Sequence, residues 1–157
     1  MYPQSYIEFL YEFHYTRDYF ECHEVLEDYW KDHTNMKRDS IWVGLIQLAV
    51  CLYHYRRNNV IGAKKLIDSS LEKLQSNREY VNKLGLSEPE LFRIIYNIKN
   101  RIELGLPYDS VDLPIHDSRL QQQLETYATK KDPDATYAYH ITSERIIHHH
   151  LKKYRTD

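Results

Sequence analysis

The stretch FECHEVLEDYW, from Phe20 to Trp30, decides the fold expected for this chain. In an α-helix each residue advances by about 100°, so the apolar side chains of this stretch gather on one face. His23 and Glu27 lie one helical turn apart at the margin of that face, beside aromatic residues. A polar pair in this position requires a hydrogen-bonding, ionic or metal partner, because burying it unpaired costs roughly 1–3 kcal/mol.

Helix signals dominate the rest of the chain, and most glycines and prolines fall where helices are expected to end. We therefore predict an all-α fold, a multihelical bundle of about five main helices followed by a C-terminal extension with one or two short helices. The main helices are expected over about 4–15, 18–32, 40–57, 60–76 and 88–104, and those of the extension over 117–127 and 143–155. Expected capping residues are Asp18 with Glu21, Asp39 or Ser40, Gly85, and Ser87 with Glu90.

The character of the sequence changes after Gly105. We divide the chain into a helical core domain, 1–104, which carries the His–Glu motif, and an extension, 105–157. The extension holds too many apolar residues to be disordered throughout, so we expect it to pack on the core or on a second subunit of a homodimer. The run His148–His150 is expected to be solvated and able to bind immobilised nickel.

Composition favours a cytoplasmic protein with no membrane span. The cysteines, Cys22 and Cys51, fall in expected helix interiors, and the chain starts at Met1 without a signal-peptide pattern. The longest apolar run, 41–53, is shorter than the ~20 residues that a span needs. No nucleotide-binding loop, nucleophile with an adjacent base or cofactor fingerprint is recognisable in the sequence.

The net charge of −2 hides a segregation of charge along the chain. Residues 1–36 hold eight acids and two bases, whereas 37–83 hold nine bases and four acids. We attribute this difference to docking of the first helices on the next ones. Nucleic acid is not the expected partner, because no nucleic-acid motif accompanies the basic residues. The candidates for an uncovered basic stripe are Arg56, Arg57, Lys64, Lys65 and Lys73.

The third predicted helix is apolar nearly all the way round, which is typical of a central, buried helix. One stripe interrupts the apolar surface, and its residues are spaced by three and four: Gly44, Gln47, Cys51, His54 and Asn58. Short loops make consecutive helices antiparallel neighbours. We therefore expect this stripe to face the His23–Glu27 margin of the second helix.

Together the two helices predict a divalent-metal site with His23, Glu27 and His54 as ligands. Histidine and glutamate are common ligands of zinc, manganese and iron, and a site with an open position can activate water. Glu24 would be the general base of a metal-dependent hydrolase. The residues expected around the metal are Gln47, Trp30, Phe20 and Asn58. The order His23-Glu24-x-x-Glu27 differs from the H-E-x-x-H motif, so that mechanism is not carried over.

A second interpretation needs no metal. In it, His23, Glu27, Gln47 and His54 form a buried polar network that fixes the register of the helices in an interaction or scaffold module. A third interpretation is a nucleic-acid adaptor that uses the basic fourth helix. The sequence leaves open whether the protein is an enzyme, and whether its partner is a small molecule or another protein.

The segments Arg17–Trp30, Gly44–Ala49 and Leu52–His54, with Asn58 and Gly62-Ala63, resemble a family of small bacterial and archaeal proteins called domain of unknown function 309. The resemblance covers about residues 6–75. The family hallmark is a His, three residues, a Glu, two residues and an aromatic, matched here by His23, Glu27 and Trp30. The resemblance implies an all-helical fold and a suggested metal site. It implies no established activity and leaves the chain from Gly105 uncovered.

Overall fold

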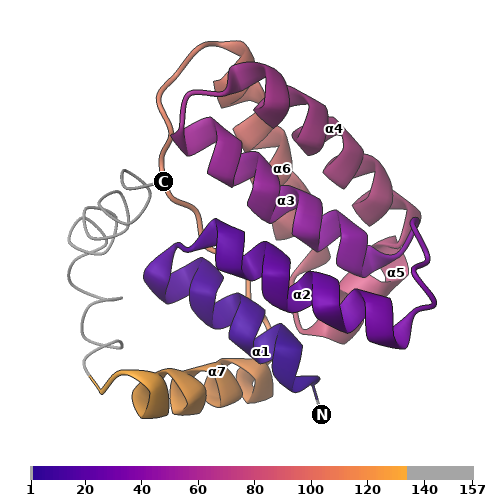
Figure 1. Cartoon of the computed structure of the whole chain (residues 1–157), viewed down its shortest axis with the longest axis vertical. Helices are drawn as coiled ribbons and strands as arrows, with labels where there is room; N and C mark the ends of the chain where they lie inside the picture. The colour runs from indigo at the N-terminus through magenta and orange to yellow at the C-terminus, as the bar shows by residue number, and fades with distance from the viewer. Residues whose placement is uncertain (1, 134–157) are drawn as a thin grey trace.

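A computed structural model describes residues 2–133, and within them the fold is all-α, as predicted from the sequence (Figure 1). A π-helical turn, Glu12–Thr16, and a 3-10 turn, Asn82–Leu84, connect some of the helices. Among residues 2–133 no strand is present, and one isolated bridge joins Leu86 to Ile115. The helices are α1 (Gln4–Tyr11), α2 (Tyr19–His33), α3 (Ile41–Arg56), α4 (Val60–Ser76), α5 (Arg78–Val81), α6 (Glu88–Glu103) and α7 (Ser118–Lys131).

Helix α3 lies between α2 and α4, with α6 packed against α4 and α1 against α2 (Figure 1). Its apolar residues are spread around the helix, so several faces are buried at once. The buried residues of α3 include Leu45, Leu48, Ala49 and Leu52. The central position predicted for this helix is therefore confirmed.

The stripe of small and polar residues on α3 faces α4, which corrects the expectation that it faces α2. The Ser70 hydroxyl of α4 donates to the Gly44 carbonyl oxygen at 2.7 Å, and Cys51 Sγ donates to the Ala63 carbonyl oxygen at 3.3 Å. A Cβ atom on Gly44 would lie 2.9 Å from Leu74. Small side chains on both helices bring the two backbones together, and this close approach determines which neighbour the stripe meets.

Side-chain caps begin four of these helices, α2, α3, α4 and α7. Asp18 accepts a hydrogen bond from the Glu21 amide at 3.0 Å at the start of α2, as predicted. Ser40 caps α3, Asn59 caps α4 and Asp117 caps α7 in the same way. The capping box predicted at Ser87 is wrong, because the Ser87 side chain accepts no cap hydrogen bond and the Glu90 carboxylate pairs with Arg93 instead.

The helix predicted over 4–15 changes its geometry partway. After Tyr11 the chain makes a π-helical turn through Thr16. Arg17 then adopts a left-handed conformation, with φ of 57°, before α2 begins. A π-helical turn inserts an extra residue into the helical register. The turn therefore changes the phase of residues 12–16 relative to the apolar face of α1.

The described part of the extension returns along the molecule from α6 to α7 (Figure 1). Helix α7 packs on α1 and runs to Lys131, beyond the predicted end at 127. Its buried residues, Leu120, Leu124 and Ala128, join the same hydrophobic core as residues of α1 to α6. The helix predicted over 143–155 and the run His148–His150 lie outside the described residues. No helix within 2–133 is long and apolar enough to span a membrane.

Candidate functional site

The predicted pair on α2 is formed. The Nε2 atom of His23 lies 2.5 Å from Oε2 of Glu27, and Lys31 Nζ lies 2.8 Å from Oε1 of the same carboxylate. The hydrogen bond from Lys31 lowers the pKa of Glu27, and the neighbouring His23 acts in the same direction. The His23 and Glu27 side chains are 28% and 31% exposed, so the pair lies at the edge of the core and in contact with water.

Glu24, the candidate general base, lies on the other side of the same imidazole. Its Oε1 atom is 3.6 Å from Nδ1 of His23. Two carboxylates therefore flank the two ring nitrogens of His23. This arrangement fixes the orientation of the ring on the helix surface.

His54, the third candidate ligand, contacts a different helix. Its Nδ1 atom lies 3.1 Å from the Asn59 side-chain amide, and its ring lies against Gly62 at the start of α4. Within residues 2–133, no three His, Cys, Asp or Glu side chains gather closely enough to hold a metal ion. The structure therefore brings His23 and Glu27 together but not His54, because the α3 stripe faces α4.

A series of four neighbouring rings extends from His23 on α2 to His54 on α3. The Phe20 ring lies 5.9 Å from the His23 ring and 6.1 Å from the Tyr53 ring, and Tyr53 lies 5.6 Å from His54. We call these residues, Phe20, His23, Tyr53 and His54, the aromatic row. It runs from α2 across α3 to the start of α4. Phe20 is 51% exposed, and the other three rings are partly exposed.

The remaining predicted residues have separate positions in the fold. Trp30 Nε1 donates to the Lys37 carbonyl oxygen at 2.7 Å and so holds the loop between α2 and α3. Asn58 adopts a left-handed conformation, φ 64°, at the corner between α3 and α4. The buried Gln47 Oε1 atom accepts no hydrogen bond from the described residues. The single buried network proposed from the sequence is thus divided into the His23–Glu27 and His54–Asn59 pairs.

Sequence reasoning missed a buried cluster around Arg17, which is 4% exposed. Its guanidinium lies 2.7 Å from the Asp112 carboxylate. It also donates hydrogen bonds to the carbonyl oxygens of Val111, at 2.6 Å, and Phe13, at 3.1 Å. Arg17 therefore joins the turn before α2 to the extension, which lies more than ninety residues further along the chain.

A second guanidinium, that of Arg56, completes this cluster. It lies 4.6 Å from the centre of the Tyr19 ring and 5.6 Å from that of Tyr108. The two tyrosine hydroxyl groups are 2.6 Å apart. From its sequence context Arg56 was expected among the cations of a basic surface, but the structure buries it between rings. We call Arg17, Tyr19, Arg56, Tyr108 and Asp112 the arginine cluster.

His14 lies beside the arginine cluster and is also buried. Its Nε2 atom accepts a hydrogen bond from the Leu113 amide at 3.3 Å. Burial lowers the pKa of His14 to about 4, although the nearby Asp112 carboxylate opposes this change. The imidazole is therefore neutral at physiological pH and acts as a hydrogen-bond acceptor for the extension.

Both cysteines are buried, as expected from their positions in helices. Burial raises the pKa of Cys22 well above its ordinary value and that of Cys51 to about 12. Their thiols are therefore protonated and donate to backbone carbonyl oxygens.

Comparisons with known proteins support the family resemblance that the sequence motifs of α2 and α3 indicate. A sequence model described as domain of unknown function (DUF309) matches residues 6–66. The protein named uncharacterized protein YpuF, from Bacillus subtilis (strain 168), is 43% identical over 157 residues, which cover 100% of this chain and 90% of that relative. No solved structure gives a significant match. From the matched motifs and this relative, we conclude that the chain belongs to the family of domain of unknown function 309.

Proposed function

We propose that the protein is an interaction module that binds a partner protein through the aromatic row. The observation that carries the proposal is the half-exposed ring of Phe20, which lies between the rings of His23 and Tyr53. Aromatic side chains are enriched in protein interfaces, where they bury large apolar areas on binding. The family hallmark thus lies beside a surface suited to docking.

Contacts on each helix hold the row in place before any partner arrives. On α2, Glu27 and Glu24 flank the His23 imidazole. On α3, the Arg57 guanidinium lies 5.0 Å from the centre of the Tyr53 ring, and Asn59 holds His54. Side chains that are already ordered lose less conformational entropy on binding, so this order favours recognition.

Neighbouring residues indicate the chemistry of the partner. Ile61, beside the glycine that His54 contacts, is 83% exposed and extends the apolar surface onto α4. Glu21, Glu24 and Asp28 are exposed on α2. A partner segment that carries apolar side chains next to lysine or arginine would complement both features.

Affinity capture with matched variants tests this proposal. The double variant Phe20→Ser, Tyr53→Ser removes two rings of the row, whereas Tyr80→Ser, Tyr96→Ser removes two exposed rings elsewhere. Captured proteins from a lysate of Bacillus subtilis, the organism of the 43% identical relative, are identified by mass spectrometry and then purified for titration. We expect a partner whose affinity falls at least tenfold with the first variant and stays within twofold with the second. Equal loss with both variants, or with neither, would refute the role of the row.

A divalent metal ion at His23 and Glu27 is the second candidate function, since an imidazole and a carboxylate, two common ligand types, lie side by side on one helix. The residues fit the metal in part, because a third protein donor is absent from residues 2–133 around them. Glu24 remains the candidate base of the hydrolase predicted from the sequence. On this proposal zinc, manganese or iron would bind weakly, with water completing its coordination.

Metal titration followed by calorimetry tests the second candidate. All proteins carry His148→Gln, His149→Gln and His150→Gln, so that this run cannot contribute binding. We expect saturable binding that His23→Ala abolishes and His116→Ala, an exposed histidine elsewhere, preserves. If both histidine variants bind the three metals as their parent does, the α2 pair is not a metal site.

A further inference from the structure

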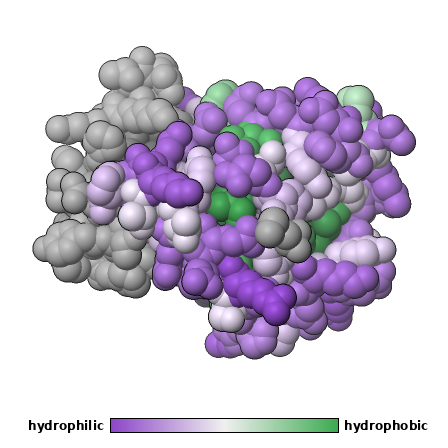
Figure 2. Space-filling view, turned by 90° about the horizontal axis from the view of Figure 1, so that it is seen from below, coloured by the Kyte–Doolittle hydropathy of each residue, from purple (hydrophilic) through white to green (hydrophobic). Residues whose placement is uncertain are grey.

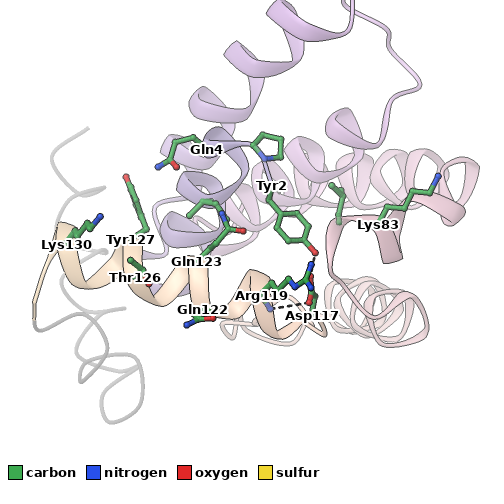
Figure 3. A pocket seen from close by; sticks show the side chains of 13 residues that line it. Tyr2, Gln4, Lys83, Asp117, Arg119, Gln122, Gln123, Thr126, Tyr127 and Lys130 are labelled. Atoms are coloured by element: carbon green, nitrogen blue, oxygen red, sulfur yellow. Dashed lines mark hydrogen bonds between the residues drawn. The ribbon is translucent and has the colours of Figure 1, made fainter.

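A pocket with a volume of about 970 Å³ opens away from the aromatic row. It lies between the start of α1, the 3-10 turn before Gly85 and helix α7 (Figure 3). This volume is at the upper end of the range for small-molecule sites, about 300–1,000 Å³. None of the residues of the aromatic row lines it.

The pocket combines apolar and aromatic surfaces. Ile7 and Leu84 are buried residues of the core that reach its lining, and Pro3 adds apolar surface. Tyr2 and Tyr127 also line it, and in Figure 3 their rings stand apart along α7. Viewed from below, the molecule shows hydrophobic patches within a largely hydrophilic face (Figure 2). Such a lining suits the apolar body of a small molecule.

Three cations line the pocket, against one carboxylate. Lys130 lies at one end in Figure 3 and Lys83 at the other, with Arg119 between them. Within residues 2–133 none of the three forms an ion pair with a carboxylate. The carboxylate is that of Asp117, which accepts hydrogen bonds from the Tyr2 hydroxyl and the Arg119 amide. The cations are therefore available to a ligand, whereas the acid is engaged.

Amide side chains supply further hydrogen-bonding groups. Gln4, Gln122 and Gln123 line the pocket, and their side chains form no hydrogen bond within the described part of the chain. Each amide group carries two donors and one acceptor oxygen. Together with the excess positive charge, they give the pocket several donors for an anionic oxygen.

We propose that this pocket binds a small organic anion. Its apolar or aromatic body would lie over Ile7 and Leu84, between the two tyrosines, and its carboxylate, phosphate or sulfonate group would contact either Arg119 at the start of α7 or Lys130 at its end. The proposal is independent of the aromatic row, since the two surfaces share no residue.

Two fluorescent probes of matched shape test the proposal on the full chain. The dye 8-anilinonaphthalene-1-sulfonate carries one sulfonate, and N-phenyl-1-naphthylamine is the same body without it. We expect saturable binding of the sulfonate dye, and binding of the neutral dye at least fivefold weaker. The amide signals that shift in an NMR titration should belong to α7 and the start of α1.

Matched charge variants identify the site. Arg119→Gln, Lys130→Gln should weaken binding of the sulfonate dye about tenfold, since the double variant removes both cations of α7 that could form the charge-assisted contact. Arg93→Gln, Lys64→Gln removes the same charge from surfaces elsewhere and should change binding less than twofold. Thr126→Trp, which fills the pocket from an exposed position, should block both dyes. Unchanged binding in the Arg119 and Lys130 variant, or equal affinity for the two dyes, would overturn the proposal.

Discussion

The Nη1 atom of Arg56 donates a hydrogen bond to the Arg17 carbonyl oxygen at 2.9 Å and thereby ties the end of α3 to the turn before α2. Arg17 has a left-handed backbone there, and its own guanidinium reaches the extension. One arginine thus fixes the backbone of the other, and both hold Tyr108 and Asp112 in place. The arginine cluster is thus a buried polar connection between the first three helices and the extension.

Removing the Arg56 guanidinium should destabilise the fold. Arg56→Ala is expected to lower the free energy of unfolding by about 2–4 kcal/mol, because it deletes a buried hydrogen bond and the packing between two rings. Arg57→Ala, at the next and exposed position, should change it by less than about 0.5 kcal/mol. Urea unfolding followed by circular dichroism measures both values. Equal effects would contradict a structural role for Arg56.

His14 should make stability fall in mild acid. Its pKa is about 4 in the folded protein and about 6.5 in the unfolded chain, so the unfolded state binds more protons between these pH values. The free energy of unfolding should therefore decrease by roughly 3 kcal/mol as the pH falls from about 6.5 to about 4. In His14→Gln, which keeps an acceptor for the Leu113 amide, this part of the decrease should disappear.

Urea titrations at several pH values compare the two proteins. The difference between them isolates His14 from the carboxylates, which also titrate in this range. His116→Gln, at an exposed position, is the control and should follow the wild type. Parallel pH profiles for wild type and His14→Gln would show that His14 does not contribute to the pH dependence of the free energy of unfolding.

Gly44→Ala tests the close approach of α3 and α4. Alanine favours a helix more than glycine does, by about 1 kcal/mol, yet its Cβ atom would lie 2.9 Å from the buried Leu74 side chain. We expect the clash to dominate and the melting temperature to fall by roughly 3–8 °C. Asn97→Ala, at an exposed position of α6, should change it by less than about 2 °C. Calorimetric melting curves decide the sign.

Glu27→Gln should have little effect on stability, in contrast to the strong effect expected if the pair were buried. The carboxylate contacts His23 and Lys31 at the surface, where solvent weakens ion pairs. We expect the melting temperature to change by less than about 3 °C. A much larger decrease would show that the pair supports the register of the helices.

The sequence allowed the all-helical fold and the positions of most helices to be predicted, since these depend on local periodicity and capping residues. It also placed His23 and Glu27 one turn apart, a spacing that any α-helix enforces. The partner of the α3 stripe was not predictable in the same way. A stripe spaced by three and four can face either neighbouring helix, and here Ala63 and Ser70 on α4 decided the outcome.

The arginine cluster escaped prediction because its contacts are distant in sequence. Arg17 and Val111 are 94 residues apart, and no local pattern couples two positions at that separation. Arginine is also mostly exposed in proteins, so a surface role was the reasonable expectation for Arg56. The rings of Tyr19 and Tyr108 change this preference, because they cover the flat guanidinium on burial.

The arginine cluster also bears on where the folding unit ends. Both guanidinium groups lie within the segment that the family shares, 6–66, but the tyrosine and the carboxylate that complete the cluster come from positions 108 and 112. A nascent chain that has left the ribosome only as far as residue 66 therefore contains both arginines but lacks Tyr108 and Asp112, which contact them in the folded protein. Until synthesis passes Leu113, Arg17, Arg56 and His14 lack the contacts that residues 108–113 provide in the folded protein. The segment that the family model matches is therefore shorter than the hydrophobic core, which includes residues up to Ala128.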